Sequence, residues 1–589
     1  MTQASPRWLL LILLAACAHS APQETKRFPS STELRQLAQK QPPKQLFSDQ
    51  TQDTDTWQLT GPLPDAVDTI EHPPASPWEQ LLQQEVQHRR GRSLAVESMY
   101  CVAREIGLFY AQRQAFPSPR LELFMTSRCG AALGHVSTSY LTGEVPAQAS
   151  DETIYQRWQP QVRDLVARHF EHGERLIGIW YGRLAGKAIV LVASGERYLT
   201  LERLPLVPPP DGKVVLRGEL LAPADRIQGH ATLGRFGFTH CELDPEVPLP
   251  RFAMTCELQP QDPWARIEIS YFPPRRVLGY VALSVMVWPA TPPAPDYTRP
   301  SFSLATSASG GTAEETFLQM VNQVRGQASL PPITLAPAQS KTAAAVAPHY
   351  FGALSKGKPD VAELVALGMM AGWEVEGQLR EGRFIAPAVR NTTDIAQLLL
   401  HAVETPTGRE VLLDPTARQL AMGPVVSAEH QALGALLSSY SFFDEGQGHG
   451  QDVQAFLERL GRLRAAKNLP PPVPVSGVSE HLTAATQRLQ RGKAPPRTVL
   501  NELLGRVSWT LQRPVKGWFL EANSVEQMQI PPEFLRGGPL HLAIAAGHYR
   551  PAGEPWWRLV FVVVNAGAEP GVTASREAPP TATVADGAH

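Results

Sequence analysis

"FLQMVNQVRGQASLPP" (317–332) returns as "FLERLGRLRAAKNLPP" (456–471), and this repetition decides the architecture. Aligned without a gap, the two stretches share Phe-Leu at the start, an arginine in the middle and Leu-Pro-Pro at the end. Apolar residues fall at i, i+4 and i+7 in both, which predicts a helix that ends at a proline-marked turn. A helical period alone does not explain the common distance from the arginine to Leu-Pro-Pro. The pattern therefore indicates an internal repeat.

Two apolar runs close each repeated stretch and read as a pair of strands after a turn. The second stretch ends in "LLDPTARQLAMGPVVS" and "ALGALLSSYSFF", and the third in "QIPPEFLRGGPLHLAIAAGHY" and "WWRLVFVVV". An earlier region with "RLIGIWYG" and "AIVLVAS" fits the same scheme, although its start matches less closely. We therefore predict a first unit at 94–197, a second at 312–445 and a third at 451–567.

The remaining segments differ from the units in composition. Residues 18–93 are rich in Gln, Pro, Thr and Asp without a clear period, and they are predicted to be a tether. Residues 198–288 contain short alternating strands between Pro, Gly and Asp clusters, which predicts a small all-β sandwich, the β module. Residues 289–311 read as a Pro/Ser/Gly linker and 568–589 as a disordered tail.

Overall composition indicates a large multidomain globular protein and gives no electrostatic case for nucleic-acid binding. The 589 residues are enough for about three to five domains, and a hydrophobic content of 43% can fill their cores. Lys and Arg number 54 against 56 for Asp and Glu, so the net charge of −2 gives no basis for nucleic-acid binding.

The N-terminus predicts export and lipidation. In "MTQASPRWLLLILLAACAHS" an arginine precedes an apolar run that is too short to span a bilayer, as in a secretory signal peptide. "LAAC", which ends at Cys17, resembles a bacterial lipobox, and this implies a signal peptide over 1–17 and a lipid-modified Cys17 that anchors the protein to a membrane. The alanine after Cys17 favours the outer membrane in the Gram-negative sorting pattern. The alternative is an ordinary signal peptide cut a few residues later.

The other four cysteines fit an oxidising compartment. Three connectivities are possible, and the local pairing Cys101–Cys129 with Cys241–Cys256 is favoured over the others and over four free thiols. Closing loops of this length stabilises a fold by around 3 kcal/mol per bond. No cysteine or histidine spacing of the kind that binds zinc is present in the sequence, so no metal and no cofactor are predicted.

The second unit resembles the CAP superfamily (the cysteine-rich secretory, antigen 5 and pathogenesis-related-1 fold). Its opening helix has Asn322 and Arg325 ahead of Leu-Pro-Pro, as in that family. The stretch "ETPTGREVLLDPTARQLAMG" (404–423) resembles a second stretch of the family in its residue types and their spacing. The resemblance implies a three-layer α-β-α sandwich. The predicted fold class is therefore α+β, with repeated CAP-like sandwich units and one small all-β sandwich.

Departures from the family pattern concern its cation site. Many family members hold a divalent ion with two His and two Glu in a cleft, but the histidine expected before Arg409 is Gly408 here. No histidine stands near Leu354, and Glu374 or Glu376 could replace only one acid. The resemblance thus implies a degenerate copy without catalytic residues.

Four residues are retained as contact candidates, each beside a structural alternative. His349 follows an alanine-rich helix, and His401 and Glu404 stand at i, i+3 on "DIAQLLLHAVE", where an ordinary helix surface is the simpler interpretation. Trp556 adjoins Trp557, and strand alternation places one of them inward and one outward. The sequence contains no G-x-S-x-G, H-E-x-x-H, P-loop or dinucleotide-binding motif.

These features together predict an envelope lipoprotein on the outer membrane that is not an enzyme. It would act as a scaffold or binding protein for another envelope protein or a surface polysaccharide. One alternative is a CAP-like hydrolase of envelope peptides or glycans. Another is a protein that binds a lipid or a small ligand.

Overall fold

The computed structural model describes residues 28–567 apart from short gaps, and helices alternate with sheets throughout. The gaps are 48–50, 89–92, 171–172, 185, 275, 291, 294–295, 300–310, 357, 430, 444–448, 493–494 and 526–527. The predicted α+β class is confirmed. Cys17 and the tail 568–589 lie outside the described residues. Within the described part, every helix is too short or too polar to traverse a bilayer.

Three sheets share one order of four strands, and in the second unit a fifth strand, β20 (Ala388–Val389), also pairs with β22. In each, a two-residue strand pairs in parallel with the first strand of a long hairpin, and the second hairpin strand pairs antiparallel with an earlier strand. The sheets are β4-β7-β8-β6 (Leu94–Ala95, Arg175–Leu184, Lys187–Glu196, Ser137–Glu144), β18-β21-β22-β19 (Thr334–Leu335, Ala417–Ser427, Ala432–Phe442, Leu379–Ile385) and β23-β25-β26-β24 (Val473–Pro474, His541–Tyr549, Arg558–Asn565, Lys516–Ala522).

The same helices also recur around each sheet. One helix precedes the two-residue strand, and two more lie between that strand and the outer strand of the sheet. They are α2 (Pro77–His88), α3 (Glu97–Arg113) and α4 (Pro119–Arg128); α6 (Ala313–Gln327), α7 (Pro337–Ser355) and α8 (Pro359–Ala371); and α11 (Gly450–Ala465), α12 (Ser479–Gln490) and α13 (Pro496–Leu511). The predicted start at 94 therefore leaves out α2, which buries Trp78, Leu81 and Leu82, and we include α2 in the first unit from here on.

Helices cover both faces of each sheet. In the second unit, α6, α9 (Ile395–Val403) and α10 (Pro406–Leu413) pack on one face, while α7 and α8 pack on the other. In the first unit, α2 and α5 (Asp151–His169) lie opposite α3 and α4. In the third, α11 and the short helix η1 (Pro532–Leu535) lie opposite α12 and α13. Each unit is thus a three-layer α-β-α arrangement with one apolar core on each side of its sheet.

A buried arginine explains the spacing of the repeated motif. Arg325 is fully buried, and its Nε donates to the carbonyl of Pro331 at 2.8 Å while Nη1 donates to that of Leu412 at 2.8 Å. Arg464 is also fully buried and repeats the pattern, donating to Pro470 at 2.6 Å and to Phe534 at 2.5 Å. Each guanidinium ties its helix to the Leu-Pro-Pro turn and to the segment that enters the hairpin. Buried polar groups must be hydrogen-bonded to be tolerated, so the distance from the arginine to the turn is constrained.

The β module is one continuous seven-stranded sheet, whereas the sequence predicted a small sandwich of two separate sheets. Its order is β16-β15-β12-β13-β14-β11-β9. Strand β13 pairs with β12 through its first five residues and with β14 through its last two, so the two halves share a strand where the sheet changes partner. The bounds are β9 Leu199–Leu201, β11 Lys213–Leu220, β12 Arg226–Leu233, β13 Gly237–Leu243, β14 Arg251–Glu257, β15 Ala265–Phe272 and β16 Tyr280–Val287.

Both disulfides form as the local pairing predicts. Cys101 bonds Cys129 and so joins α3 to the end of α4 in the first unit. Cys241 bonds Cys256 and staples β13 to β14 in the β module.

Residues assigned to a tether are packed against the units over their described part, so that prediction is wrong for 28–88. Helix α1 (Ser31–Ala38) has a capping box and inserts Leu34, which is 1% exposed, against α7 and α8. Further on, β1 (Thr51–Gln52), β2 (Thr56–Gln58) and β3 (Ala66–Val67) pair with β5 (Phe116–Pro117), β17 (Asp296–Thr298) and β10 (Leu204–Pro205). Strands of two or three residues leave no periodic pattern in the sequence. Since β17 belongs to the predicted linker 289–311, that segment is also partly packed.

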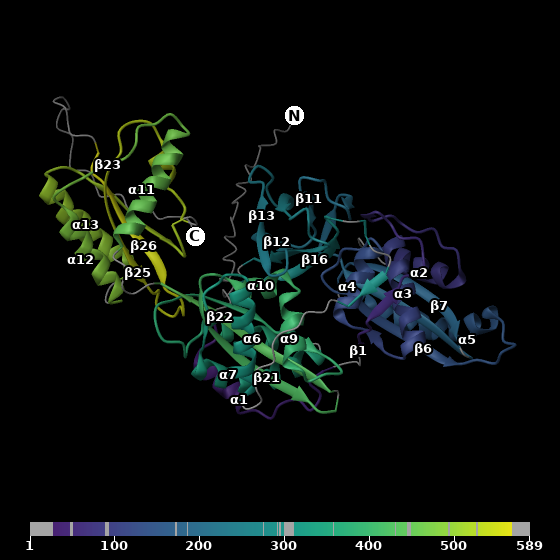
Figure 1. Cartoon of the computed structure of the whole chain (residues 1–589). Coiled ribbons are helices and arrows are strands. Elements are labelled where there is room, and N and C mark those ends of the chain that lie inside the picture. Colours follow the sequence, from purple (N-terminus) through teal and green to yellow (C-terminus); the bar gives the residue numbers. More distant parts are fainter. Residues whose placement is uncertain are drawn as a thin grey trace, which may run out of the picture.

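Figure 1 shows the third unit at one end of the molecule, the first unit at the other, and the second unit with the β module between them. The β module contacts both neighbours. The backbone amide of Ser284 in β16 donates to the carbonyl of Leu133 of the first unit at 3.1 Å, and β12, β13 and β15 contact α10 of the second unit. The β module therefore lies between the first unit, which it contacts through β16, and the second unit, which it contacts at α10.

Candidate functional site

Helix α10 carries the densest polar contacts between the β module and the second unit. Thr405 caps its first turn by accepting from the amide of Gly408 at 2.8 Å, and Pro406 fits the first helical position, which needs no amide donor. Arg409 follows at once and is 4% exposed. The local sequence Thr-Pro-Thr-Gly-Arg thus starts a short helix whose first turn faces the β module.

Arg409 holds the β12–β13 turn. Its Nη1 donates to the carbonyls of Leu233 at 3.1 Å, Gly234 at 3.1 Å and Gly237 at 2.6 Å, while Nε donates to its own unit at Val403, 2.7 Å away. Burial lowers the pKa of Arg409 to about 10, so the guanidinium stays charged at neutral pH. Charge-assisted hydrogen bonds to three carbonyls of the β module make this arginine a strong polar link across the junction.

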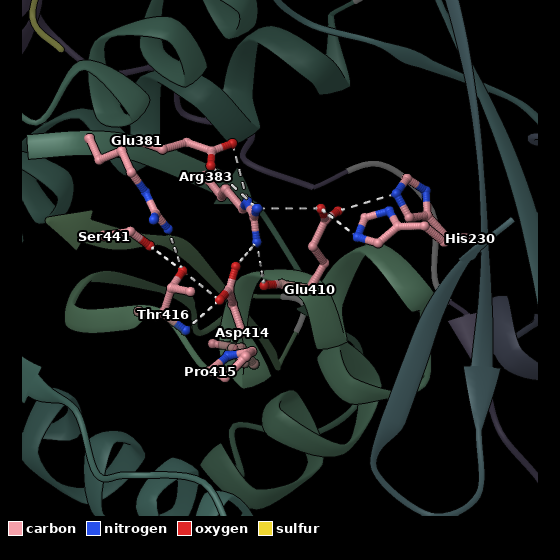
Figure 2. Close-up of polar contacts among 12 residues, drawn as sticks. His230, Glu381, Arg383, Glu410, Asp414, Pro415, Thr416 and Ser441 are labelled. Carbon is pink, nitrogen blue, oxygen red and sulfur yellow. Dashed lines mark hydrogen bonds and ion pairs between the residues drawn. The ribbon is translucent and has the colours of Figure 1, made fainter. Parts of the chain in front are cut away.

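Three carboxylates surround Arg383 of β19 next to this link (Figure 2). Its Nη2 lies 3.3 Å from Oε2 of Glu381 and 3.8 Å from Oε1 of Glu410, and its Nη1 donates to Oδ2 of Asp414. Burial alone would raise the pKa of Asp414, but Arg383 and the hydrogen bonds from Thr416 outweigh it and lower that pKa. Arg383 thus pairs with carboxylates from β19, from α10 and from the segment that follows α10.

Two histidines of the β module face this cluster from the other side. His230 on β12 and His240 on β13 are direct cross-strand partners, and their ring centroids are 4.7 Å apart. Nε2 of His230 lies 3.6 Å from Oε2 of Glu410, and Nε2 of His240 lies 4.0 Å from Oε1. Figure 2 shows the imidazole of His230 directed at Glu410. Burial lowers the pKa of His230, which keeps this ring neutral at pH 7.

His401 and Glu404, predicted to lie on an ordinary helix surface, lie in the interface with the first unit. Glu404 forms an ion pair with Arg120 at the start of α4, and the side chains of the pair are 13% and 14% exposed. Burial lowers the pKa of His401 to about 4, with further contributions from Arg120 and Arg266. The i, i+3 spacing is real, but it serves packing between units rather than an open binding face.

The other two contact candidates also make internal contacts. His349 is 6% exposed in α7, and burial lowers its pKa. Trp556 donates its indole N–H to the carbonyl of Met370 at 3.0 Å and packs on Phe28 with ring centroids 4.8 Å apart. Trp556 therefore joins the third unit to the second instead of presenting a free surface.

A serine–histidine pair lies in the described part of the first unit, but its surroundings do not suit nucleophilic catalysis. Nδ1 of His169 and Oγ of Ser194 are 2.7 Å apart, and both residues are buried, at 7% and 0% exposure. Burial lowers the pKa of His169 to about 4, and the neighbouring Arg175 adds to that effect. A general base requires a histidine near its ordinary pKa and an accessible nucleophile. The pair stabilises the interior of the first unit.

A cleft of about 550 Å³ opens in the first unit beside the Cys101–Cys129 disulfide. Aromatic side chains line it together with acidic ones, among them Trp78, Trp180, Asp68 and Glu97. Ser98 and Tyr100 also line it; each is 7% exposed, and both hydroxyls are buried without a hydrogen-bond partner. Unpaired buried hydroxyls in the wall of a cleft mark positions that a ligand could satisfy.

Comparison with known proteins gives no family for the chain. No family model matches it, and no curated protein matches it. The CAP resemblance of the second unit therefore stays a prediction.

Sequence reasoning did not single out His230, His240 or Glu410, because the three residues come from two modules and have no common spacing. One local signal was available. His230 and His240 lie at equal distances from the turn centred on Arg235, so a hairpin there makes them cross-strand partners. Nothing local predicts that this hairpin contacts α10.

Proposed function

We propose that the protein is a lipid-anchored, non-catalytic lipoprotein of the cell envelope, whose repeated units form a scaffold for another envelope protein or a surface polysaccharide. The observation that supports this role is the junction at Arg409, where one buried guanidinium bonds three carbonyls of another module. Modules joined by buried charge-assisted bonds hold their surfaces in a fixed relative position and orientation. A scaffold needs its modules in fixed relative positions, and loosely linked domains would not be held in this way.

The scaffold role is tested by crosslinking in intact cells. A photo-reactive residue replaces Trp509, which is 78% exposed on α13, and a second one replaces Tyr140, which is 40% exposed on β6. A scaffold should give the same defined crosslinked products from both positions. Arg409→Ala should change the products, so that the two positions no longer agree. Arg418→Ala is the matched control, since Arg418 is an exposed arginine of the same unit that bonds only to neighbouring carbonyls. Hydrolysis of envelope peptides or glycans by the purified protein, lost on one cleft substitution, would contradict the proposal.

Lipid anchoring on the outer membrane is a separate part of the proposal and rests on the "LAAC" sequence that ends at Cys17. Several acyl chains on one cysteine hold a protein stably on a bilayer, because each buried CH₂ contributes about 0.8 kcal/mol. Cys17→Ala should move the protein from the membrane fraction to the soluble one. Unchanged membrane retention would refute lipidation.

Small-ligand binding is a second candidate function, favoured by the cleft of the first unit. Its volume of about 550 Å³ falls in the range of small-molecule sites. Its aromatic and acidic lining suits an amphipathic or cationic ligand. Native mass spectrometry of protein extracted from its own membrane should show a bound species that Trp180→Ala removes and Trp509→Ala retains. Identical spectra of the three proteins without added mass would remove this candidate.

A further inference from the structure

The residues His230, His240 and Glu410 gather three potential metal ligands where the β module meets the second unit. One atom of each can be chosen so that all three atoms lie within 4.8 Å of one another. The two histidines are held by the cross-strand pairing of β12 and β13, and Glu410 is held by α10, next to the buried Arg409. The group therefore stands on regular elements rather than on loops, which is the arrangement that positions ligands accurately.

The spacing of these atoms is close to that of a tetrahedral zinc centre. Zinc lies about 2.0–2.1 Å from imidazole nitrogen and carboxylate oxygen, so two ligand atoms around it are separated by about 3.3–3.4 Å. The Nε2 atoms of His230 and His240 lie 3.6 Å and 4.0 Å from the two oxygens of Glu410. These separations exceed hydrogen-bond length, and modest side-chain movement would bring the atoms into a coordination sphere.

His230 supplies a second, independent observation. It is 4% exposed, and neither ring nitrogen has a hydrogen-bond partner. An unsatisfied buried polar group is costly and calls for an explanation, such as an ion that the site is built to hold. A metal ion on Nε2 would satisfy the nitrogen that points toward Glu410.

We propose that His230, His240 and Glu410 bind one divalent transition-metal ion, best matched by zinc, which joins the β module to the second unit. Two imidazoles and one carboxylate form a mixed nitrogen and oxygen set that suits zinc and does not suit calcium or magnesium, which prefer oxygen ligands alone. The side chain of His240 is 59% exposed, so water can reach the fourth position. This inference goes beyond the envelope role and does not depend on it.

Arg383 does not block the site. It lies 3.8 Å from Glu410, but it also pairs with Glu381 and Asp414, so its charge stays compensated when Glu410 turns to the ion (Figure 2). A second group, His449, Asp452 and His548, is less suitable. Nδ1 of His548 is already 2.6 Å from Oε1 of Gln378, and His449 pairs with Asp452 at 3.4 Å.

The test is a zinc titration of the full-length protein, purified without a polyhistidine tag and stripped with a chelator. Calorimetry should show one zinc equivalent that is lost in His240→Ala and in Glu410→Gln. Both changes are tolerable, because His240 is largely exposed and Gln keeps the shape of Glu410. His88→Ala is the matched control, an exposed histidine of the first unit that should keep the full stoichiometry. Saturating zinc should also raise the Tm of the wild type by about 5 °C and leave the two site variants unchanged.

Cobalt substitution gives a readout that general destabilisation would not move. The intensity of the visible d–d bands of Co²⁺ separates four-coordinate from six-coordinate sites, and strong bands should appear in the wild type and in His88→Ala only. A further equivalent at His449 would be recognised by its loss in His449→Ala and would not affect the comparison. Zinc stoichiometry that is zero in the wild type, or equal in the wild type and both site variants, would overturn the proposal.

Discussion

The second and third units share one frame but use it differently. Both anchor the opening helix through a buried arginine, Arg325 or Arg464, to the segment before the hairpin. In the second unit that segment is α10, and its other side carries the β module through Arg409 and Glu410. In the third unit the segment is the four-residue helix η1. Both units thus keep the internal arginine anchor. The outer side of the segment before the hairpin contacts the β module in the second unit.

Removing the two anchors should give the largest effects and test whether they are equivalent. Arg325→Met and Arg464→Met each leave several carbonyls unsatisfied in an apolar interior, and we expect a loss of about 4 kcal/mol in the affected unit. Hydrogen exchange read by mass spectrometry would follow each unit separately. Arg464→Met should deprotect the third unit alone, whereas Arg325→Met should also deprotect the β12–β13 turn. Equal and local effects of both variants would show that α10 does not couple the anchor to the junction.

Arg409→Ala should break the junction and leave the second unit folded. The lost bonds reach three carbonyls of the turn that starts β13, and a loss of about 3 kcal/mol in local stability is expected there. Limited proteolysis should then cut the turn between β12 and β13 faster than in the wild type. Arg418→Ala controls for removal of an exposed arginine from the same unit. Protection of the turn in both variants alike would mean that apolar contacts alone hold the junction.

A pH test addresses the face of the second unit that the first unit covers. The pKa of His401 is lowered to about 4 in the folded protein, chiefly by burial and then by Arg120 and Arg266, from about 6.5 in an unfolded chain. The unfolded state therefore binds more protons as the pH falls, so this contribution is complete above pH 6.5 and is lost toward pH 4. We expect about 2 kcal/mol less stability at pH 4.5 than at pH 7 from this group, measured by urea unfolding.

His401→Gln should remove that part of the pH dependence. The difference between wild type and variant isolates His401, because Glu404 titrates in both proteins. His88→Gln, which changes an exposed histidine, should follow the wild-type profile. A His401→Gln profile parallel to that of the wild type would show that His401 is not desolvated at the interface.

Local periodicity in the sequence predicted the helices and strands of this protein better than it predicted how the modules pack against one another. The repeated helix, the hairpins and both disulfides follow from spacing within short stretches, because a turn and its flanking apolar runs lie together in the chain. Packing between modules has no such spacing. His401 and Glu404 form an ordinary helical pair by sequence, and only the distant Arg120 makes them an interface. The strands of 51–67 are two or three residues long and pair with remote segments, so a Pro- and Gln-rich composition concealed them.

The smallest test exchanges a residue of the opening helix that makes an internal side-chain bond in the second unit and has no side chain in the third. Asn322 of α6 donates to the carbonyl of Ile333 and accepts from its amide, each at 2.9 Å, and Gly461 holds the corresponding place in α11. A Cβ added at Gly461 meets no atom within 4 Å, so Gly461→Ala should stabilise the third unit by about 0.7 kcal/mol through helix propensity. Asn322→Ala should instead destabilise the second unit by about 2 kcal/mol, because both backbone groups of Ile333 lose their partner. Hydrogen exchange in α6 and α11 would measure the opposite signs, and a gain in both helices would mean that propensity outweighs the asparagine bonds.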